Sequence, residues 1–259
     1  MGGESSTSTA PRGGGAGTAR TGSSLGQRLS GVAVALGLVL FLGGFGWAAV
    51  VYRPYTVPTS SMSPTIGVGD RVVAQRIDGD EVRRGDVVVF KDTAWVSGSK
   101  VVKRVVAVGG DTVSCCTNGK LTVNGKQIDE PYLPEGSLAE IKNFPTVKVP
   151  EGRLFLLGDE RQGSLDSTAH LTDAAGGTVS RNAVSARVDA VVWPMNGMLK
   201  RPTGFEAIGT LSQPGPLRVI VYLIVGGALL ILAGSLYGPV AKLAGRSGAR
   251  GRAEAVRAG

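Results

Sequence analysis

Residues 100–127 read KVVKRVVAVGGDTVSCCTNGKLTVNGKQ and establish the structural class of the chain's centre. Runs rich in valine alternate with Gly/Asp and Asn-Gly segments, which is the pattern of strands joined by tight turns. Asn124-Gly125 is typical of a two-residue type I′ hairpin, because both central positions of this turn need a positive φ. The stretch therefore predicts consecutive short strands.

The same pattern continues on both sides of this stretch. Strands are expected at Arg71–Gln75, Asp86–Phe90, Lys100–Val108, Thr112–Cys116, Lys120–Val123, Arg153–Leu157 and Ser185–Trp193. Residues 53–216 show no amphipathic helical pattern longer than about three turns. We therefore expect residues 53–216 to form one mainly β domain, large enough for its own hydrophobic core.

Two further segments are apolar and long enough to cross a membrane. Residues 31–52 carry no charge, and a helix of that length measures about 33 Å against roughly 30 Å of hydrocarbon. Residues 217–241 contain a second uncharged run, with Tyr222 and Tyr237 near its ends, where interfacial aromatic side chains are favoured. We expect two transmembrane helices. The alternatives are a cleaved signal peptide for the first and a buried core helix for the second.

The distribution of charge predicts the orientation of these spans. The net charge is +8, of which residues 1–30 carry +2 and residues 242–259 carry +4. Residues 53–216 are nearly neutral, with 19 basic and 18 acidic side chains. Because basic residues near the ends of spans stay on the cytoplasmic side, we expect both termini in the cytoplasm and the central domain on the far side.

The same composition limits the classes of function. A basic chain invites a nucleic-acid-binding hypothesis, but most of the net charge lies in the two tails, so we expect no nucleic-acid partner. One histidine and two adjacent cysteines exclude His-cluster metal sites and four-cysteine zinc sites, and we expect neither a metal nor a cofactor. The Gly/Ser/Thr-rich residues 1–30 and the tail from Gly245 onward are expected to be disordered.

A candidate nucleophile follows the first span directly. Residues 57–65, VPTSSMSPT, contain five hydroxyl side chains and two prolines. Proline restricts the backbone to extended conformations, so this segment could present a hydroxyl group rigidly; the alternative is a solvated linker. A serine hydroxyl needs a base for activation.

Lys103 and His170 could supply that base. In VVKRVVAV, residues 101–108, alternation places Lys103 and Arg104 on opposite faces of a strand, so one basic side chain must face inward or lie close to the membrane. Burial lowers the pKa of a lysine, as a general base requires. The alternative is an edge-strand lysine whose ammonium group reaches solvent.

Cys115 and Cys116 are adjacent, in a domain that we expect to be in an oxidising compartment. Neighbouring Cα atoms are about 3.8 Å apart, which is shorter than ordinary disulfide geometry. Free thiols, a strained vicinal disulfide and a bond between molecules therefore remain open.

Four motifs in this order resemble the boxes of bacterial type I signal peptidases, in a form with an additional C-terminal span. They are SMSPT at 61–65, GDRVV at 69–73, KRVV with GGD at 103–111, and GD with SLDS at 158–167. The VNGK hairpin and DEPY at 129–132 fit the same family. Several short motifs in the right order after a span are far more specific than any one of them.

The resemblance implies a membrane-bound serine endopeptidase that cuts signal peptides from exported preproteins after small residues, usually Ala-x-Ala. Its β fold would combine a catalytic core with a smaller inserted β region. Ser61 would be the nucleophile and Lys103 the general base. The oxyanion would be held by the backbone N–H of Ser61 and by Thr59 Oγ1, and Ser164 and Asp166 would support the site.

The resemblance also implies a location, partners and a substrate pocket. The domain would lie outside a bacterial cytoplasmic membrane, with secreted preproteins, membrane lipid and the secretion translocon as partners. The positions that match pocket-lining residues are Met62, Ile66, Val89 and Val102. Any of these four could equally be an ordinary core residue.

The sequence departs from the family pattern at three places. Glu160 replaces the usual Asn, and Thr59-Ser60 replaces Ser-Gly. Thr168 stands where an Arg is expected, so Asp166 lacks its usual partner, and Arg161 or Arg104 are the candidate substitutes.

Three rival hypotheses remain. The first is a Ser/His signal peptidase that uses His170, although Lys103 in KRVV argues against it. The second is another Ser/Lys peptidase, such as a self-cleaving repressor, which would need a DNA-binding domain. The third is a non-enzymatic, membrane-anchored β-domain that binds envelope or secreted partners, and it predicts that Ser61→Ala leaves function intact.

Overall fold

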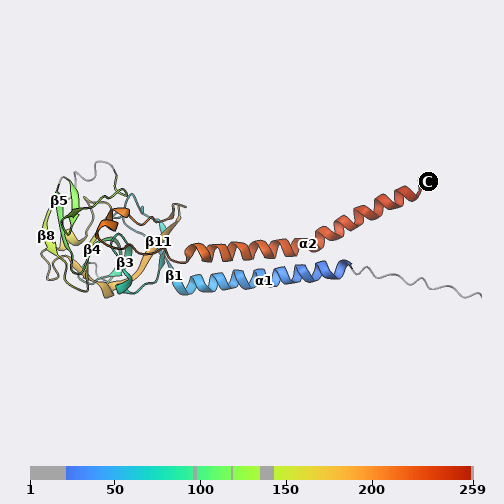
Figure 1. Ribbon diagram of the computed structural model, residues 1–259, viewed down its shortest axis with the longest axis horizontal. Helices are drawn as coiled ribbons and strands as arrows, with labels where there is room; N and C mark the ends of the chain where they lie inside the picture. Colours follow the sequence, from blue (N-terminus) through green and yellow to red (C-terminus); the bar gives the residue numbers. More distant parts are fainter. Residues whose placement is uncertain (1–21, 96–97, 118, 135–142, 258–259) are drawn as a thin grey trace, which may run out of the picture. The chain divides into compact units, whose positions relative to one another are not determined.

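The computed structural model describes residues 22–95, 98–117, 119–134 and 143–257, and it divides into two units. One unit contains helix α1 (Gly22–Val51) up to Gly43 and helix α2 (Leu217–Arg257) from Leu223. The other unit, residues 44–222, contains the described strands and the remaining ends of both helices (Figure 1).

The two helices approach each other closely within the helix unit (Figure 1). Ser30 Oγ donates a 2.6 Å hydrogen bond to the carbonyl oxygen of Gly234. A Cβ atom on Gly227 would lie only 2.6 Å from the backbone nitrogen of Phe41, so the contact requires glycine. Small residues at such contacts are typical of helix pairs in membranes.

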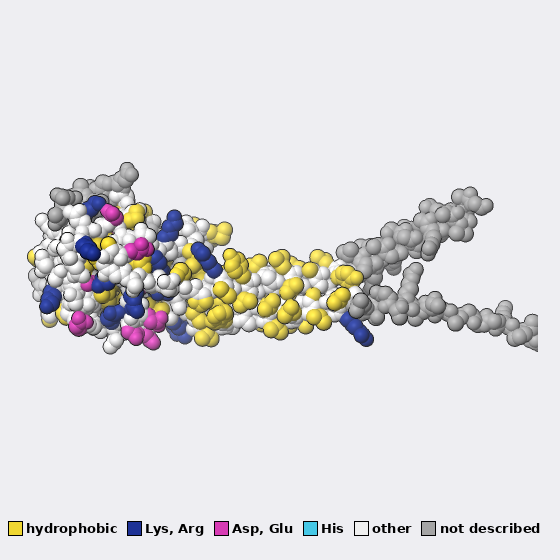
Figure 2. Space-filling model, in the orientation of Figure 1, with side chains coloured by type: hydrophobic (Ala, Val, Ile, Leu, Met, Phe, Trp, Pro, Cys, Tyr) yellow, Lys and Arg dark blue, Asp and Glu magenta, His cyan; other side chains and the backbone are white. Residues whose placement is uncertain are grey.

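Both helices contain a segment that is long and apolar enough to cross a membrane, as the sequence predicts. These segments are Gly26–Val51 and Leu217–Tyr237, with mean hydropathies of 2.2 and 2.5. Figure 2 shows apolar side chains covering the surface of this region.

The helices extend further than the sequence predicted. α1 begins at Gly22, inside the segment expected to be disordered, and α2 continues past Gly245 to Arg257. Extending an existing helix costs little, because the unfavourable nucleation step has already been made. The Ala and Arg residues of this tail favour a helix, whereas Gly245, Gly248 and Gly251 oppose it.

The β-domain contains two antiparallel sheets. The larger has the order β1-β2-β11-β3-β4-β9-β10, with β12 beside β11, and the smaller has the order β7-β6-β5-β8. The strands are β1 (Tyr52–Thr56), β2 (Arg71–Gln75), β3 (Val87–Lys91), β4 (Lys100–Val108), β5 (Thr112–Thr117), β6 (Lys120–Val123), β7 (Lys126–Gln127), β8 (Phe144–Lys148), β9 (Arg153–Leu157), β10 (Thr178–Ser180), β11 (Val184–Trp193) and β12 (Gly197–Met198).

All seven predicted strands are present, with ends displaced by at most one residue. The predicted hairpin is confirmed: Val123 pairs with Lys126, and Asn124 and Gly125 have φ values of 52° and 76°. Sequence analysis missed β1, β8, β10 and β12, whereas β7 is the second strand of the predicted hairpin. β1 and β8 contain prolines and lie at sheet edges, where a missing N–H is tolerated.

Hydrophobic clusters cover both faces of the central strands. One cluster packs the segment after β1, including Met62 and Ile66, onto β2, β3 and β11. Another lies on the opposite face and includes Phe90 and Val105. Consequently both Lys103 and Arg104 are buried, whereas sequence alternation required only one of them to face inward.

The third cluster joins β4 and β9 to the smaller sheet, and it includes Cys115, Phe144 and Phe155. Cys115 forms a disulfide with Cys116 across a cis peptide bond, which selects one of the three states that the sequence left open.

Candidate active site

The loop between β1 and β2 holds Ser61 in a fixed place. The amide of Val57 donates to the carbonyl of Asp70, and the amide of Gly69 donates to the carbonyl of Val57, so the loop is closed at its base. The next side chain, Met62, is completely buried in the core below. The half-buried Ser61 is therefore anchored by its neighbours on both sides.

Ser61 has polar groups close to both its side chain and its carbonyl. Thr59 Oγ1 lies 3.2 Å from Ser61 Oγ, and the amide of Glu160 donates a 3.2 Å hydrogen bond to the Ser61 carbonyl. A Cβ atom on Gly158 would collide with that carbonyl and with Ser164 Oγ. Glycine at position 158 therefore lets the Ser61 loop and the Ser164 loop meet.

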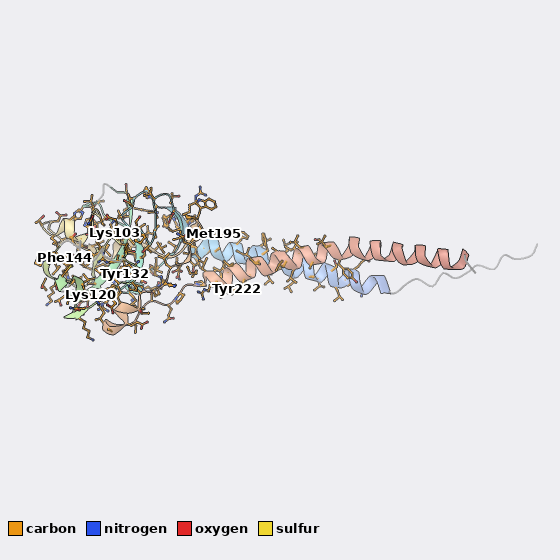
Figure 3. The ribbon with its side chains drawn as sticks, turned by 90° about the horizontal axis from the view of Figure 1, so that it is seen from above. Lys103, Lys120, Tyr132, Phe144, Met195 and Tyr222 are labelled. Carbon is orange, nitrogen blue, oxygen red and sulfur yellow. A yellow bond between two sulfur atoms is a disulfide. The ribbon has the colours of Figure 1, made fainter. Side chains whose placement is uncertain are left out.

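Lys103 lies on β4, with only 3% of its surface exposed. Its position inside the β-domain is visible in Figure 3. Burial lowers the pKa of Lys103 from 10.5 to about 8, against the opposing influence of the carboxylates of Asp166, Asp159 and Glu160. No ion pair with Lys103 is found among the described residues. An amine with this pKa is partly neutral at physiological pH, as proton abstraction requires.

Ser61 and Lys103 line one groove of about 480 Å³. The described residues around it are Tyr55, Thr56, Val57, Pro58, Thr59, Ser60, Ser61, Val89, Ser99, Lys100, Val101, Val102, Lys103, Gly163 and Leu165. The groove thus brings together the predicted nucleophile, the predicted base and the predicted oxyanion donor.

Two strand edges border this groove. β4 pairs with β3 along Lys100–Arg104, but its pairing with β9 begins only at Arg104. Its other edge is therefore open over residues 100–103, within the part of the chain that the structure describes. β1 is the terminal strand of its sheet, so it also has a free edge. Open edges of this kind can accept an extended peptide through backbone hydrogen bonds.

Ser164 and Asp166 lie behind Ser61 and Lys103. Ser164 Oγ is buried and finds no hydrogen-bond partner among the described residues. Asp166 is 2% exposed, and one of its carboxylate oxygens accepts a 2.9 Å bond from the amide of Gly158. Thr168 donates to the other oxygen through its hydroxyl at 2.8 Å and its amide at 3.1 Å. Thr168, which stands where the resemblance led us to expect an arginine, thus itself donates to Asp166.

Neither arginine proposed as a substitute pairs with Asp166. Arg104 makes two bonds, of 2.8 and 2.6 Å, to Asp159. Arg161 makes two bonds, of 2.9 and 2.6 Å, to Glu130. Each guanidinium is already occupied by a carboxylate that matches its fork geometry.

These ion pairs hold the loops around the site. Asp159 accepts a 2.5 Å hydrogen bond from Thr65, which follows Ser61 by four residues. Arg161 donates from Nε to the carbonyl of Gly158 at 3.0 Å. Arg104 lies 3.8 Å from the centre of the Tyr132 ring. The network therefore connects the Ser61 loop, β4 and the DEPY segment.

The predicted pocket residues divide into two groups. Val89 and Val102 line the groove. Met62 and Ile66 do not line it, and both are fully buried in the cluster that also contains Val89. They support the groove floor from below.

His170 lies in a different environment. Its ring stacks on Trp95 at 4.5 Å, and Nδ1 lies 2.7 Å from a carboxylate oxygen of Asp173. It is absent from the described lining of the groove. The geometry therefore gives no support to a Ser/His pair.

Sequence analysis missed Tyr55, Lys100 and Leu165 as groove residues. Lys100 Nζ lies 4.8 Å from the centre of the Tyr55 ring, and Leu165 is 71% exposed at the rim. The available signal was the position of Lys100, on the same predicted strand as Lys103.

Comparisons with known proteins bear on this site. Residues 29–193 match the family model described as signal peptidase, peptidase S26. Signal peptidase I of Mycobacterium tuberculosis H37Rv is 34% identical over 193 residues, covering 56% of this chain and 66% of that protein. The chain thus spans about two thirds of the length of this relative. Signal peptidase I of Bacillus licheniformis is 32% identical, covering 68% and 93%.

The comparison with solved structures finds the crystal structure of a signal peptidase I from Enterococcus faecalis V583. It shares 25% identity with this chain, covers 46% of this chain and 97% of that one, and has a TM-score of 0.33.

Proposed function

The chain belongs to the signal peptidases of the peptidase S26 family, and we propose that it removes N-terminal signal peptides from exported preproteins as a membrane-bound serine endopeptidase. The observation that carries this proposal is the groove that holds the half-buried Ser61 hydroxyl together with the buried Lys103. The lowered pKa of Lys103 supports its assignment as the base.

The proposed reaction begins with neutral Lys103. Its amine takes the proton of Ser61 Oγ as this oxygen attacks the scissile carbonyl. The resulting ammonium then gives the proton to the leaving amine as the C–N bond breaks, which leaves an ester on Ser61. Lys103 next takes a proton from water as the hydroxide attacks the ester. Its ammonium then gives that proton to Ser61 Oγ as the ester C–O bond breaks, which releases the signal peptide and restores the neutral amine.

The negative charge on the attacked carbonyl oxygen needs fixed donors. In this proposal they are the backbone N–H of Ser61 and the hydroxyl of Thr59. Two observations support the assignment: Thr59 Oγ1 lies 3.2 Å from Ser61 Oγ, and the Ser61 amide has no backbone acceptor among the described residues. The extra methyl group of threonine, relative to serine, further limits rotation of the donor.

Ser164 and Asp166 are proposed to position Lys103. The buried, unpaired hydroxyl of Ser164 is suited to accept a hydrogen bond from the amine. Asp166 is held by Gly158 and Thr168, and its charge favours the ammonium form that arises after the first proton transfer.

The substrate is proposed to bind as an added strand between the open edges of β1 and β4. Successive side chains of a strand alternate in direction, so the residues at positions −1 and −3 before the cleaved bond would point to the same side. Val89 and Val102 on that side would favour small residues such as Ala-x-Ala.

Membrane attachment is proposed to place this groove where exported chains emerge. Both termini would lie in the cytoplasm, because the basic tails flank the two spans. Trp193 and Met195 are 65% and 88% exposed, and Figure 3 shows Met195 and Tyr222 toward the same end of the β-domain. Exposed apolar side chains there are suited to contact lipid.

The test is processing of a preprotein with an Ala-x-Ala site by the full chain in detergent. We expect Ser61→Ala and Lys103→Met each to lose at least about a thousandfold in kcat/KM, as removal of triad residues does in other serine peptidases. Ser63→Ala and Lys148→Met are matched controls outside the groove, and they should cleave normally. Retained cleavage by Ser61→Ala would favour the non-enzymatic hypothesis, and loss on His170→Ala would favour the histidine hypothesis.

A further inference from the structure

Two lysines lie beside each other on β3 and β4, and one of them lines the groove. Lys100 begins β4, three residues before Lys103, and lines the groove. Lys91 ends β3 and is the direct cross-strand partner of Lys100. Both side chains are exposed.

This arrangement leaves two positive charges without compensation. Directly opposed residues in an antiparallel pair project on the same face, and like charges there destabilise the sheet. Neither lysine has an ion-pair partner among the described residues. The nearest carboxylate in sequence, on Asp92, accepts a hydrogen bond from the amide of Ala94 instead.

The ammonium group of Lys100 lies against an aromatic ring. It is 4.8 Å from the centre of the Tyr55 ring, and both residues line the groove. This cation–π contact holds the charge in place without neutralising it. No carboxylate occurs among the described residues that line the groove.

We propose that Lys100 and Lys91 form a subsite for an acidic side chain of the substrate, upstream of the cleaved bond. The inference rests on the proposed function, because it assumes that the peptide lies along β4 with its upstream part in the groove. Three residues of strand separate Lys103 from Lys100, a distance of about 10 Å. A peptide with position −1 at Lys103 would therefore bring the backbone of position −4 beside Lys100. Lys100 and Val102 project on one face of β4, so the side chain that reaches Lys100 is that of position −5, which points to the same side as −1 and −3.

The expected selectivity is modest and depends on salt. An exposed ion pair changes an equilibrium by a small factor, so we expect glutamate at −5 to raise kcat/KM about threefold over glutamine, and lysine there to lower it about threefold, with a smaller effect at −4. These ratios should approach one near 0.5 M salt, where exposed charges are strongly screened.

The experiment compares three peptides that differ only in Glu, Gln or Lys at position −4, with a second set varied at −5, using the full chain in uncharged detergent. In Lys100→Glu, the new carboxylate pairs with Lys91, so the kcat/KM values for the Glu and Lys peptides should become equal. The double variant Lys91→Glu/Lys100→Glu should reverse that ratio. The double variant Lys120→Glu/Lys148→Glu has the same net charge, and its changes lie on the four-stranded sheet, so it should keep the wild-type ratio.

The outcomes separate this inference from the proposed function. Equal cleavage of all three peptides at both positions by an active wild-type chain, or no change in ratio with the Lys91/Lys100 double variant, would refute the subsite and leave the proposed function standing. Loss of the ratio in the Lys120/Lys148 control would assign the effect to net charge alone and would also refute the subsite. Failure of wild type to cleave even the Gln peptides would refute the proposed function.

Discussion

The pH dependence of cleavage tests the base directly. A lysine with a pKa of about 8 is neutral in about 9% of molecules at pH 7 and about 1% at pH 6. The pKa is lowered, so the active, neutral form gains population as pH rises. We therefore expect kcat/KM to fall about tenfold for each unit below pH 7 and to level off above pH 9.

The assay is kcat/KM of a signal-peptide substrate without titrating side chains, from pH 5.5 to 10 at constant ionic strength. A rising limb centred near pH 8 would support Lys103 as the base. A limb near 10.5 would mean that burial does not lower the pKa of Lys103, and it would refute Lys103 as a base that is partly neutral at pH 7. A limb near 6.5 that disappears in His170→Ala would transfer the role to the histidine.

Four further predictions concern single residues. Thr59→Val should lower kcat/KM about a hundredfold or more with little change in KM, and Thr59→Ser should restore most of it; wild-type rates in the valine variant would exclude the donor. Lys103→Met should raise the free energy of unfolding by about 3 kcal/mol at pH 7. Burial lowers the pKa of Lys103 from 10.5 to about 8, and each pKa unit of that drop costs the folded state about 1.36 kcal/mol while the lysine is charged. Denaturant unfolding should show this gain shrinking as pH rises through 8 toward 10.5, and a constant gain would contradict it. Asp166→Asn should move the rising limb of the pH profile below 8, since it removes a charge that raises the pKa of Lys103; an upward shift would oppose this role. Gly227→Leu should lower the thermal stability of the detergent-solubilised chain by about 1–3 kcal/mol through overpacking against α1, whereas Gly226→Leu, where a Cβ meets no neighbour, should not.

Local patterns were sufficient for much of the β-domain. Asn124-Gly125 specified its hairpin because the turn geometry depends on those two residues alone. β1 and β8 were missed because Pro54 and Pro145 oppose strand formation locally, and only the edge position makes them acceptable. That position depends on pairing between segments far apart in the chain.

For the candidate site too, local sequence identified some residues but not their partners. Motif order led to Ser61 and Lys103, and the structure brings both to one groove. The pairing of Arg104 with Asp159 and of Arg161 with Glu130 could not be deduced, because several carboxylates were equally plausible partners in the sequence. The role of Thr168 as a donor to Asp166 was hidden for a similar reason, since a short hydroxyl side chain binds only what the local backbone places beside it.

The open edges of β1 and β4 also affect how the proposed reaction would end. If the groove binds the chain upstream of the cleaved bond, the released signal peptide keeps the small residues and the extended backbone that were recognised before cleavage. It would then compete with the next preprotein as a product inhibitor. Turnover would be limited by how fast spent signal peptides leave for the lipid or are degraded, and the mature protein, which loses those contacts, would depart first.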